Sequence, residues 1–209
     1  MAVAKINRDM IAYSAAISAC EKGEKWALAL GVLAEMTEAA VAKDCVVYSA
    51  AISACEKGTQ WQMALWLLQE MPVSKVDRDI IAFNAAITAC GRGGEWQLAL
   101  TLLDEMAETK IGKSVVTYSS ATISCAKGGP WQLALGLLGE MVKATGTAGV
   151  DTYNVVISSC ETVQALPEAS AGRFRALALA ASSTSPFTLR KMVLRTPVAL
   201  NMLSQLQTC

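Results

Sequence analysis

Residues 46–71 read VVYSAAISACEKGTQWQMALWLLQEM, and the main residue types of this stretch return along the chain at a spacing of 35. The recurring columns are aromatic (Tyr13, Tyr48, Phe83, Tyr118, Tyr153), Cys (Cys20, Cys55, Cys90, Cys125, Cys160), Trp (Trp26, Trp61, Trp96, Trp131) and Met (Met36, Met71, Met106, Met141). Self-similarity at a fixed period of about 20–50 residues is the signature of a stacked repeat array. We therefore expect a stack of similar units rather than a closed globule.

The composition favours close helix packing and excludes several classes of function. Hydrophobic residues make up 53% of the 209 residues but aromatic residues only 6%. Lys and Arg number 18, as do Asp and Glu, so the overall charge favours no particular partner. The sequence contains no His, which removes the commonest general base and metal ligand. We expect no catalytic site, no metal and no cofactor. We also expect no membrane span, because no apolar run reaches about 18 residues.

Five of the seven cysteines fall in one column, with one in each unit. Packed helices lie about 8–10 Å apart, so equivalent cysteines in successive units should exceed the Cα separation of about 7 Å that a disulfide tolerates. We predict that these five cysteines are reduced and buried as small apolar side chains.

Each unit is predicted to contain two helices, with units at 10–44, 45–79, 80–114 and 115–149. In the second unit, Tyr48, Ile52 and Cys55 form one helical stripe. The following helix is expected from near Trp61 to Met71. In the fourth unit, Thr122 stands where the other units have Ile.

Cap residues are expected at both ends of the first helix of each unit. Asp44 and Asp79 are candidates for N-caps. A glycine column follows the first helix and is interpreted as a set of C′ residues, namely Gly23, Gly58, Gly93 and Gly128.

The ends of the chain depart from the regular pattern. Residues 1–9 match residues 71–79 in phase and are interpreted as the tail of a truncated repeat. Residues 150–179 form a degenerate fifth repeat, in which the Trp column is lost. Residues 180–209 are interpreted as a linker followed by a C-terminal cap or a disordered tail.

A 35-residue unit that opens with V-x-Y-[SN] and closes with E-M-x(6,7)-D resembles the pentatricopeptide repeat of the P type, over about residues 1–160. The resemblance implies an all-α fold, a right-handed α-solenoid of helix-turn-helix repeats. It also implies sequence-selective binding of single-stranded RNA, one base per repeat, in an organellar adaptor without enzymatic activity. Residence in a mitochondrion or plastid is a further implication of the family, although no targeting peptide is visible.

The resemblance assigns roles to residues at matching positions. The base-reading pairs are Ser14 with Asp44, Ser49 with Asp79, Asn84 with Ser114, and Ser119 with Gly149, and Asn154 begins a fifth pair. The base-flanking aliphatic residues are Ile11, Val46, Ile81 and Val116, and the phosphate-binding cations are Lys22, Lys57, Arg92 and Lys127. The first two pairs resemble pairs that favour guanine and the third one that favours cytosine. The fourth lacks a side chain at Gly149 and is expected to be tolerant, so the predicted preference is G-G-C-N.

Other interpretations of these residues stay open at this point. Asp44 and Asp79 can be helix caps and nothing more, and the cations can complement the C-terminal ends of helix dipoles. The repeats can also form a protein-interaction solenoid, or the RNA-binding arm of a nuclease similar to protein-only RNase P. The nuclease needs a carboxylate-rich domain, and residues 161–209 contain only Glu161 and Glu168. The polar pairs favour RNA over a peptide, which would need apolar anchors.

Overall fold

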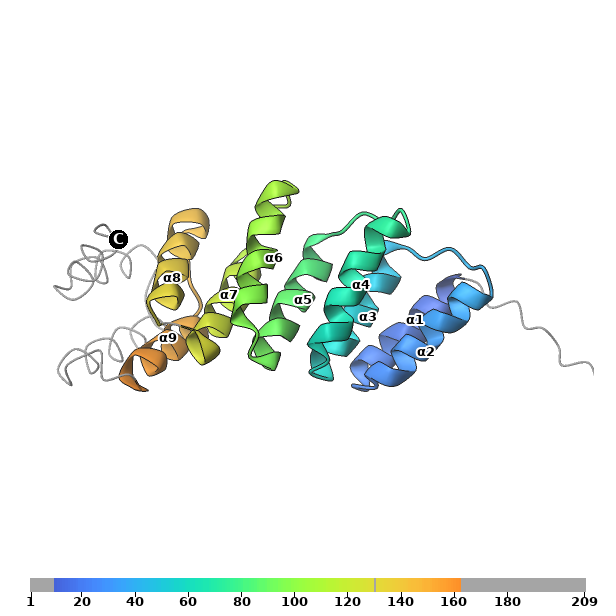
Figure 1. Cartoon of the computed structure of the whole chain (residues 1–209), viewed down its shortest axis with the longest axis horizontal. Coiled ribbons are helices and arrows are strands. Elements are labelled where there is room, and N and C mark those ends of the chain that lie inside the picture. The colour runs from blue at the N-terminus through green and yellow to red at the C-terminus, as the bar shows by residue number, and fades with distance from the viewer. Residues whose placement is uncertain (1–9, 130, 163–209) are drawn as a thin grey trace, which may run out of the picture. The chain divides into compact units, whose positions relative to one another are not determined.

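The computed structural model describes residues 10–129 and 131–162, with the backbone alone for the last three of these. The first helices of successive repeats are α1 (Met10–Lys22), α3 (Cys45–Lys57), α5 (Ile80–Gly93), α7 (Val115–Gly128) and α9 (Val150–Thr162). The second helices are α2 (Trp26–Glu38), α4 (Trp61–Val73), α6 (Trp96–Glu108) and α8 (Trp131–Thr145) (Figure 1). The described residues contain no strand, which confirms the predicted all-α class. Residues 1–9 and 163–209, including the predicted linker and cap, lie outside the described part.

The chain divides into two units, Met1–Lys113 and Ser114–Cys209. In the first unit, α1 packs against α2 and α3, while α3 packs against α4 and α5 as well, and α5 packs against α6. In the second unit, α7 packs against both α8 and α9. The core of each unit is built from the repeated columns, with the Met column and the matching Ala column fully buried: Met36, Met71, Met106, Met141, Ala29, Ala64, Ala99 and Ala134. Both units therefore bury the residue types whose period predicted the repeats.

The predicted N-caps are present in the structure. The Asp44 carboxylate accepts a hydrogen bond from the Val47 amide at 2.9 Å, and Asp79 accepts one from the Ala82 amide at 2.8 Å. These bonds satisfy an amide that the first turn of a helix leaves without a partner. The same position is taken before α7 by Ser114, whose hydroxyl accepts from the Thr117 amide at 3.3 Å.

The glycine column has a different role from the predicted one. Gly58 has a φ of −80°, whereas the left-handed residue is Thr59, with a φ of 56°. The amide of Gln60 donates to the Cys55 carbonyl, and that of Thr59 to the Glu56 carbonyl, which is the Schellman pattern with Thr59 at C′. The left-handed residue likewise follows Gly23 and Gly93, at Glu24 and Gly94, so the C′ assignment is wrong by one residue in the first three repeats. After Gly128 the backbone of Gly129 is extended, and Gly128 is not a left-handed C′ residue either.

At Gly58 and Gly93, close approach of a Trp side chain is the reason for glycine. A Cβ on Gly58 would overlap Cδ1 of Trp26 and lie 2.7 Å from its Cγ. A Cβ on Gly93 would meet the Trp61 ring in the same way, at 2.9 Å from Cγ. Each of these Trp residues begins the second helix of the preceding repeat, so the pair joins one repeat to the next.

The cysteine prediction holds for part of the column only. Cys55, Cys90 and Cys125 are free and buried, and burial raises the pKa of their thiols to about 11, 12 and 11. Cys20 is free but only half-buried, so its predicted burial is wrong. Within the described residues, α1 is packed by α2 and α3, whereas α3 also has a helix on its other side. The side chain of Cys160 lies outside the described part.

One buried position in the second unit contains a polar group without a partner. Thr122 occupies the column of Ile17, Ile52 and Ile87, and like them it is 0% exposed. Within the described residues, its hydroxyl makes no hydrogen bond. A buried polar group that is left unsatisfied costs about 1–3 kcal/mol.

We therefore expect Thr122→Val to increase the free energy of unfolding by about 1 kcal/mol, because Val has the same shape without the hydroxyl. Urea denaturation monitored by circular dichroism measures this change as a shift in midpoint. Thr117→Val is the matched control: Thr117 is equally buried on the same helix, but its hydroxyl accepts a bond from the Ser114 amide at 3.1 Å. That control should be destabilised, and a lower midpoint for Thr122→Val would contradict the prediction.

Candidate nucleic-acid interface

The second residue of each first helix in α1, α3, α5 and α7 is an exposed aliphatic side chain. The exposed fractions are 73% for Ile11, 55% for Val46, 57% for Ile81 and 58% for Val116. Single exposed apolar residues are ordinary on protein surfaces, but these four occupy one position of the repeat. A repeated exposed apolar position indicates a surface made for an apolar ligand face.

A polar residue lies one helical turn further along each of these helices. The pairs are Ile11 with Ser14, Val46 with Ser49, Ile81 with Asn84, and Val116 with Ser119. Residues three apart are neighbours on one helix face. Each of these helices therefore has an exposed apolar group one turn from a polar side chain, which is half-buried in α1, α5 and α7 but buried in α3.

The base-reading pair of the second repeat is hydrogen-bonded within the first unit. The Ser49 hydroxyl donates to Oδ1 of Asp79 at 3.1 Å, and the Ala82 amide donates to the same oxygen at 2.8 Å. Within the described residues, Oδ2 of Asp79 makes no hydrogen bond. Ser49 itself is only 5% exposed, while Asp79 is half-buried. The carboxylate is thus held by two donors on one oxygen, while its other oxygen accepts no hydrogen bond from the described residues.

The remaining predicted pairs are arranged differently. Ser14 and Asp44 both lie half-buried in the first unit, and no hydrogen bond joins these two described residues. Asn84 belongs to the first unit and Ser114 to the second. In the second unit Ser119 accepts a bond from Thr152 at 3.0 Å, and Gly149 is exposed. Asn154, which begins the fifth pair, is exposed on α9.

Two of the predicted phosphate-binding cations form ion pairs with the preceding repeat. The Lys57 ammonium lies 3.0 Å from the Glu21 carboxylate and donates to the Glu21 carbonyl at 3.3 Å. Arg92 binds the carboxylate and the carbonyl of Glu56, both at 3.2 Å. Burial raises the pKa of Glu56 above its ordinary value, and the nearby charges of Arg92 and Lys57 offset only part of this rise. A phosphate at these two cations therefore competes with a carboxylate already in place.

The other two cations lack this glutamate column. Lys22 and Lys127 are both exposed. In the repeat before Lys127, Gly91 occupies the sequence position that Glu56 takes in the repeat before Arg92. Their positive charges lie at the C-terminal ends of α1 and α7, where a cation also complements the helix dipole.

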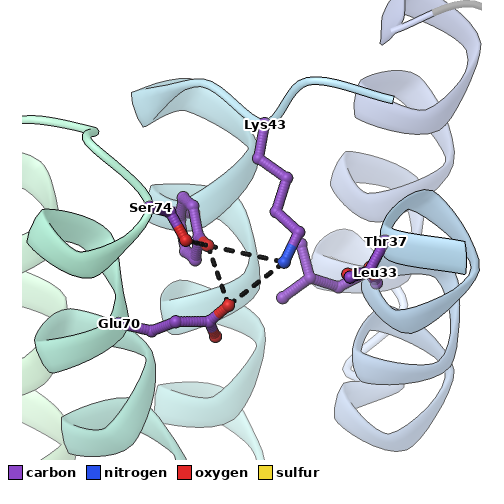
Figure 2. A network of polar contacts seen from close by, with 6 residues as sticks. Leu33, Thr37, Lys43, Glu70 and Ser74 are labelled. Carbon is purple, nitrogen blue, oxygen red and sulfur yellow. Dashed lines mark hydrogen bonds and ion pairs between the residues drawn. The ribbon is translucent and has the colours of Figure 1, made fainter. Parts of the chain in front are cut away.

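A second group of charged residues positions the start of α3. Lys43, in the segment before α3, donates to Oε1 of Glu70 on α4 at 3.1 Å (Figure 2). The Tyr48 hydroxyl bonds to the same carboxylate oxygen at 3.0 Å and to Ser74 at 2.9 Å. The Lys43 and Glu70 side chains are only 11% and 21% exposed, so this pair is shielded from solvent. The network ties the first turn of α3, which includes Val46, to the end of α4.

The next repeat contains the equivalent ion pair, without the hydrogen bonds of a tyrosine hydroxyl because Phe83 takes the place of Tyr48. Arg78 pairs with Glu105 on α6, and its guanidinium lies 5.2 Å from the centre of the Phe83 ring. The sequence reasoning above missed these residues and also the Glu21 and Glu56 partners of Lys57 and Arg92. The signal for Lys43, Arg78 and their partners was a cation before each aspartate cap and a glutamate before each Met, both at the spacing of 35. Glu21 and Glu56 are also 35 residues apart.

The described residues offer neither a metal site nor a membrane span. In residues 10–129 and 131–162, no group of three or more Cys, Asp or Glu side chains is arranged to hold a metal ion. None of the helices in that part of the chain has the length and apolarity of a membrane span.

Comparison with solved structures gives the fold. The crystal structure of the pentatricopeptide repeat protein PPR10 bound to an 18-nt psaJ RNA element superposes with a TM-score of 0.68 at 20% identity, over 85% of this chain and 26% of PPR10. PPR10 from maize gives 0.67 at 17% identity, over 89% and 26%. The PPR domain of Arabidopsis thaliana protein-only RNase P 1, in complex with tRNA, gives 0.65 at 14% identity, over 92% and 95%. The chain thus spans about a quarter of PPR10, and the likeness shows an all-α repeat solenoid.

Comparison with family models gives the family, whereas no curated protein matched the sequence. The model of the PPR repeat matches residues 11–41, 46–76 and 116–144, and that of the pentatricopeptide repeat domain matches residues 66–127. Together these matches cover residues 11–41 and 46–144, more than half of the 209 residues. The chain belongs to the pentatricopeptide repeat family.

Proposed function

We propose that this chain is an adaptor that binds single-stranded RNA, with each regular repeat contacting one base. The observation that carries the proposal is the column of aliphatic side chains that are 55–73% exposed, each one helical turn from a polar residue. The aliphatic group suits the face of an unstacked base, and the polar group suits its hydrogen-bonding edge.

The second repeat supports a preference for guanine. Oδ2 of Asp79 is a charged acceptor, and its direction is set by the two donors on Oδ1. Guanine offers N–H donors on its Watson–Crick edge that such a carboxylate accepts. Lys22 and Lys127 are exposed cations suited to phosphates, and Lys57 and Arg92 contribute where phosphate displaces their glutamates.

The solved structures with this fold support RNA as the ligand. PPR10 was crystallised with an 18-nt RNA element, and the PPR domain of the protein-only RNase P with tRNA. The proposal includes no catalytic step for this chain, and an organellar role in a mitochondrion or plastid follows from the family. A peptide ligand is less well supported, because Ser49 and Asp79 are polar residues where a peptide groove would place apolar pockets.

The variant Ser49→Asn tests the assignment of the second repeat. It creates an Asn–Asp pair, and we expect the preference at the second base to move from guanine towards uracil. The Asn side chain fits this position of the repeat, since Asn84 occupies it in α5. Fluorescence anisotropy with single-stranded probes that differ only at the second base measures the change.

Ser53→Asn is the control, because Ser53 lies on the same helix one turn beyond Ser49. Its probe preference should equal that of the parent protein. An unchanged preference in Ser49→Asn would remove the base-reading assignment and favour the peptide-binding alternative.

A further inference from the structure

The predicted base site of the fourth repeat, which lies wholly in the second unit, differs from that of the second repeat at three neighbouring positions where the fourth repeat meets the fifth. Asp151 stands 35 residues after Val116, in the column of exposed aliphatic residues. Gly149 stands in the column of the capping aspartates, and Thr152 in the column of Val47 and Ala82. All three residues lie at the start of α9, so the changes meet at one end of one helix.

The first consequence concerns the hydroxyl of the base-reading serine. Ser49 donates its proton to a carboxylate, which leaves the second carboxylate oxygen for a ligand. Ser119 instead accepts a hydrogen bond from Thr152 at 3.0 Å, and its own proton is directed at the sulfur of Met141, 3.9 Å away. Thr152 is 2% exposed and Met141 is fully buried. Both hydrogen-bond partners of Ser119 are therefore buried protein groups, although Ser119 itself is half-buried and Ser49 is buried.

The second consequence is electrostatic. Asp151 is exposed in the first turn of α9, where a carboxylate interacts favourably with the helix dipole. A base stacked at this position would have to desolvate that charge, which is unfavourable without a compensating partner. The phosphates of the same nucleotide would also repel it. An aliphatic side chain such as Val116 imposes neither cost.

We propose that Asp151 excludes an RNA base from the fourth repeat, in which the hydrogen bonds of Ser119 are already made to Thr152 and Met141. This inference rests on the proposed RNA-binding function. It differs from the tolerance predicted from Gly149: a tolerant repeat holds any base, and its nucleotide adds affinity, whereas an excluding repeat gains nothing from a fourth nucleotide. Asp151 then limits the first four repeats to three contacted bases.

The test compares labelled G-G-C with the four G-G-C-N probes on the full chain, by fluorescence anisotropy. In the parent protein, the fourth nucleotide should change affinity by less than about 2-fold. In Asp151→Val it should add at least about 5-fold, because burial of an aliphatic side chain against a base face is worth that or more. Asp151→Asn, which removes the charge but remains polar, should give an intermediate gain.

Asp104→Val is the control for loss of an exposed carboxylate, since Asp104 lies on α6, outside the first-helix column. It should behave like the parent. A gain from the fourth nucleotide in the parent, or an unchanged ratio in Asp151→Val while G-G-C still binds, would overturn the exclusion by Asp151 alone. If neither protein binds G-G-C or any G-G-C-N probe, the proposed function fails, and this inference fails with it.

Discussion

Replacing Asp79 by Ser is expected to remove most of the discrimination at the second base while leaving the fold intact. Under the proposed function the Asp79 carboxylate has two separable roles, since Oδ1 caps α5 through the Ala82 amide and Oδ2 would accept a hydrogen bond from the base. A serine fulfils the first role, as Ser114 shows by capping α7. It lacks the second carboxylate oxygen, and a well-made base contact is worth roughly 1–3 kcal/mol of discrimination. The ratio of affinities for guanine over other bases should therefore fall by roughly 5- to 150-fold.

The measurement uses four probes that differ at the second base, together with urea denaturation of the same variant. Ser and Asp are about equally good N-caps, so the midpoint should change little. Asp77→Ser is the control for charge, because Asp77 is exposed two residues before Asp79. It should weaken or strengthen binding equally for all probes. If Asp79→Ser keeps the discrimination of the parent, Asp79 is a helix cap and nothing more.

Much of the fold follows from the period of the sequence. The starts of the first helices, at Met10, Cys45, Ile80, Val115 and Val150, keep the spacing of 35. Caps such as Asp44 were also predictable, because the signal for a cap lies within four residues of the helix that it begins. Local residue patterns therefore predict where each helix lies and how its first turn is satisfied.

Contacts between repeats were not predictable in the same way. Glu21 and Lys57 are 36 residues apart, and their ion pair depends on how one hairpin packs on the next. The bond from Thr152 to Ser119 spans 33 residues and depends on the same packing. In the candidate site, the residue columns could be identified from the sequence. The partners of Lys57 and Ser119, which are Glu21 and Thr152, could not. The half-burial of Cys20 likewise depends on which helices pack against α1.

The recurrence of glycine after the first helix was recognised from the sequence, but the reason for it was not. Gly58 follows a helix, which is typical of a left-handed C′ residue, yet the left-handed backbone lies at Thr59. The Trp26 ring that requires glycine is 32 positions away in the sequence. Since a φ of −80° is open to any residue, the glycine is needed for space and not for backbone freedom.

Replacing Gly58 by Ala is therefore expected to destabilise the first unit by about 1–3 kcal/mol, the usual cost of overpacking. The new Cβ would overlap Cδ1 of Trp26 and lie within 2.7 Å of Cγ and 3.1 Å of Cβ. These atoms are at the root of the ring, so a small rotation of the side chain does not move them away. The alternative adjustment separates α3 from α2 and loosens the contact between two repeats.

Gly23→Ala is a matched control, because Gly23 occupies the same position of the preceding repeat. Its nearest described neighbour for a new Cβ is the Ala19 carbonyl at 3.4 Å, an ordinary contact. There the change should be neutral or stabilising by up to about 1 kcal/mol, since Ala reduces the freedom of the unfolded chain. Urea denaturation of the two variants is followed by circular dichroism. Their free energies of unfolding should change in opposite directions or differ by at least about 1 kcal/mol.

A second substitution separates steric overlap from any other effect of Ala at position 58. In the background of Trp26→Leu, which removes the ring, Gly58→Ala should cost little, because the atoms that it overlaps are largely absent. The difference between its cost in the parent and in this background is the coupling energy of the pair, and contacting residues typically show about 0.5–3 kcal/mol. Equal costs in both backgrounds would show that Trp26 does not set the requirement for glycine. The alternation of Trp and Gly between repeats would then need a cause other than close packing.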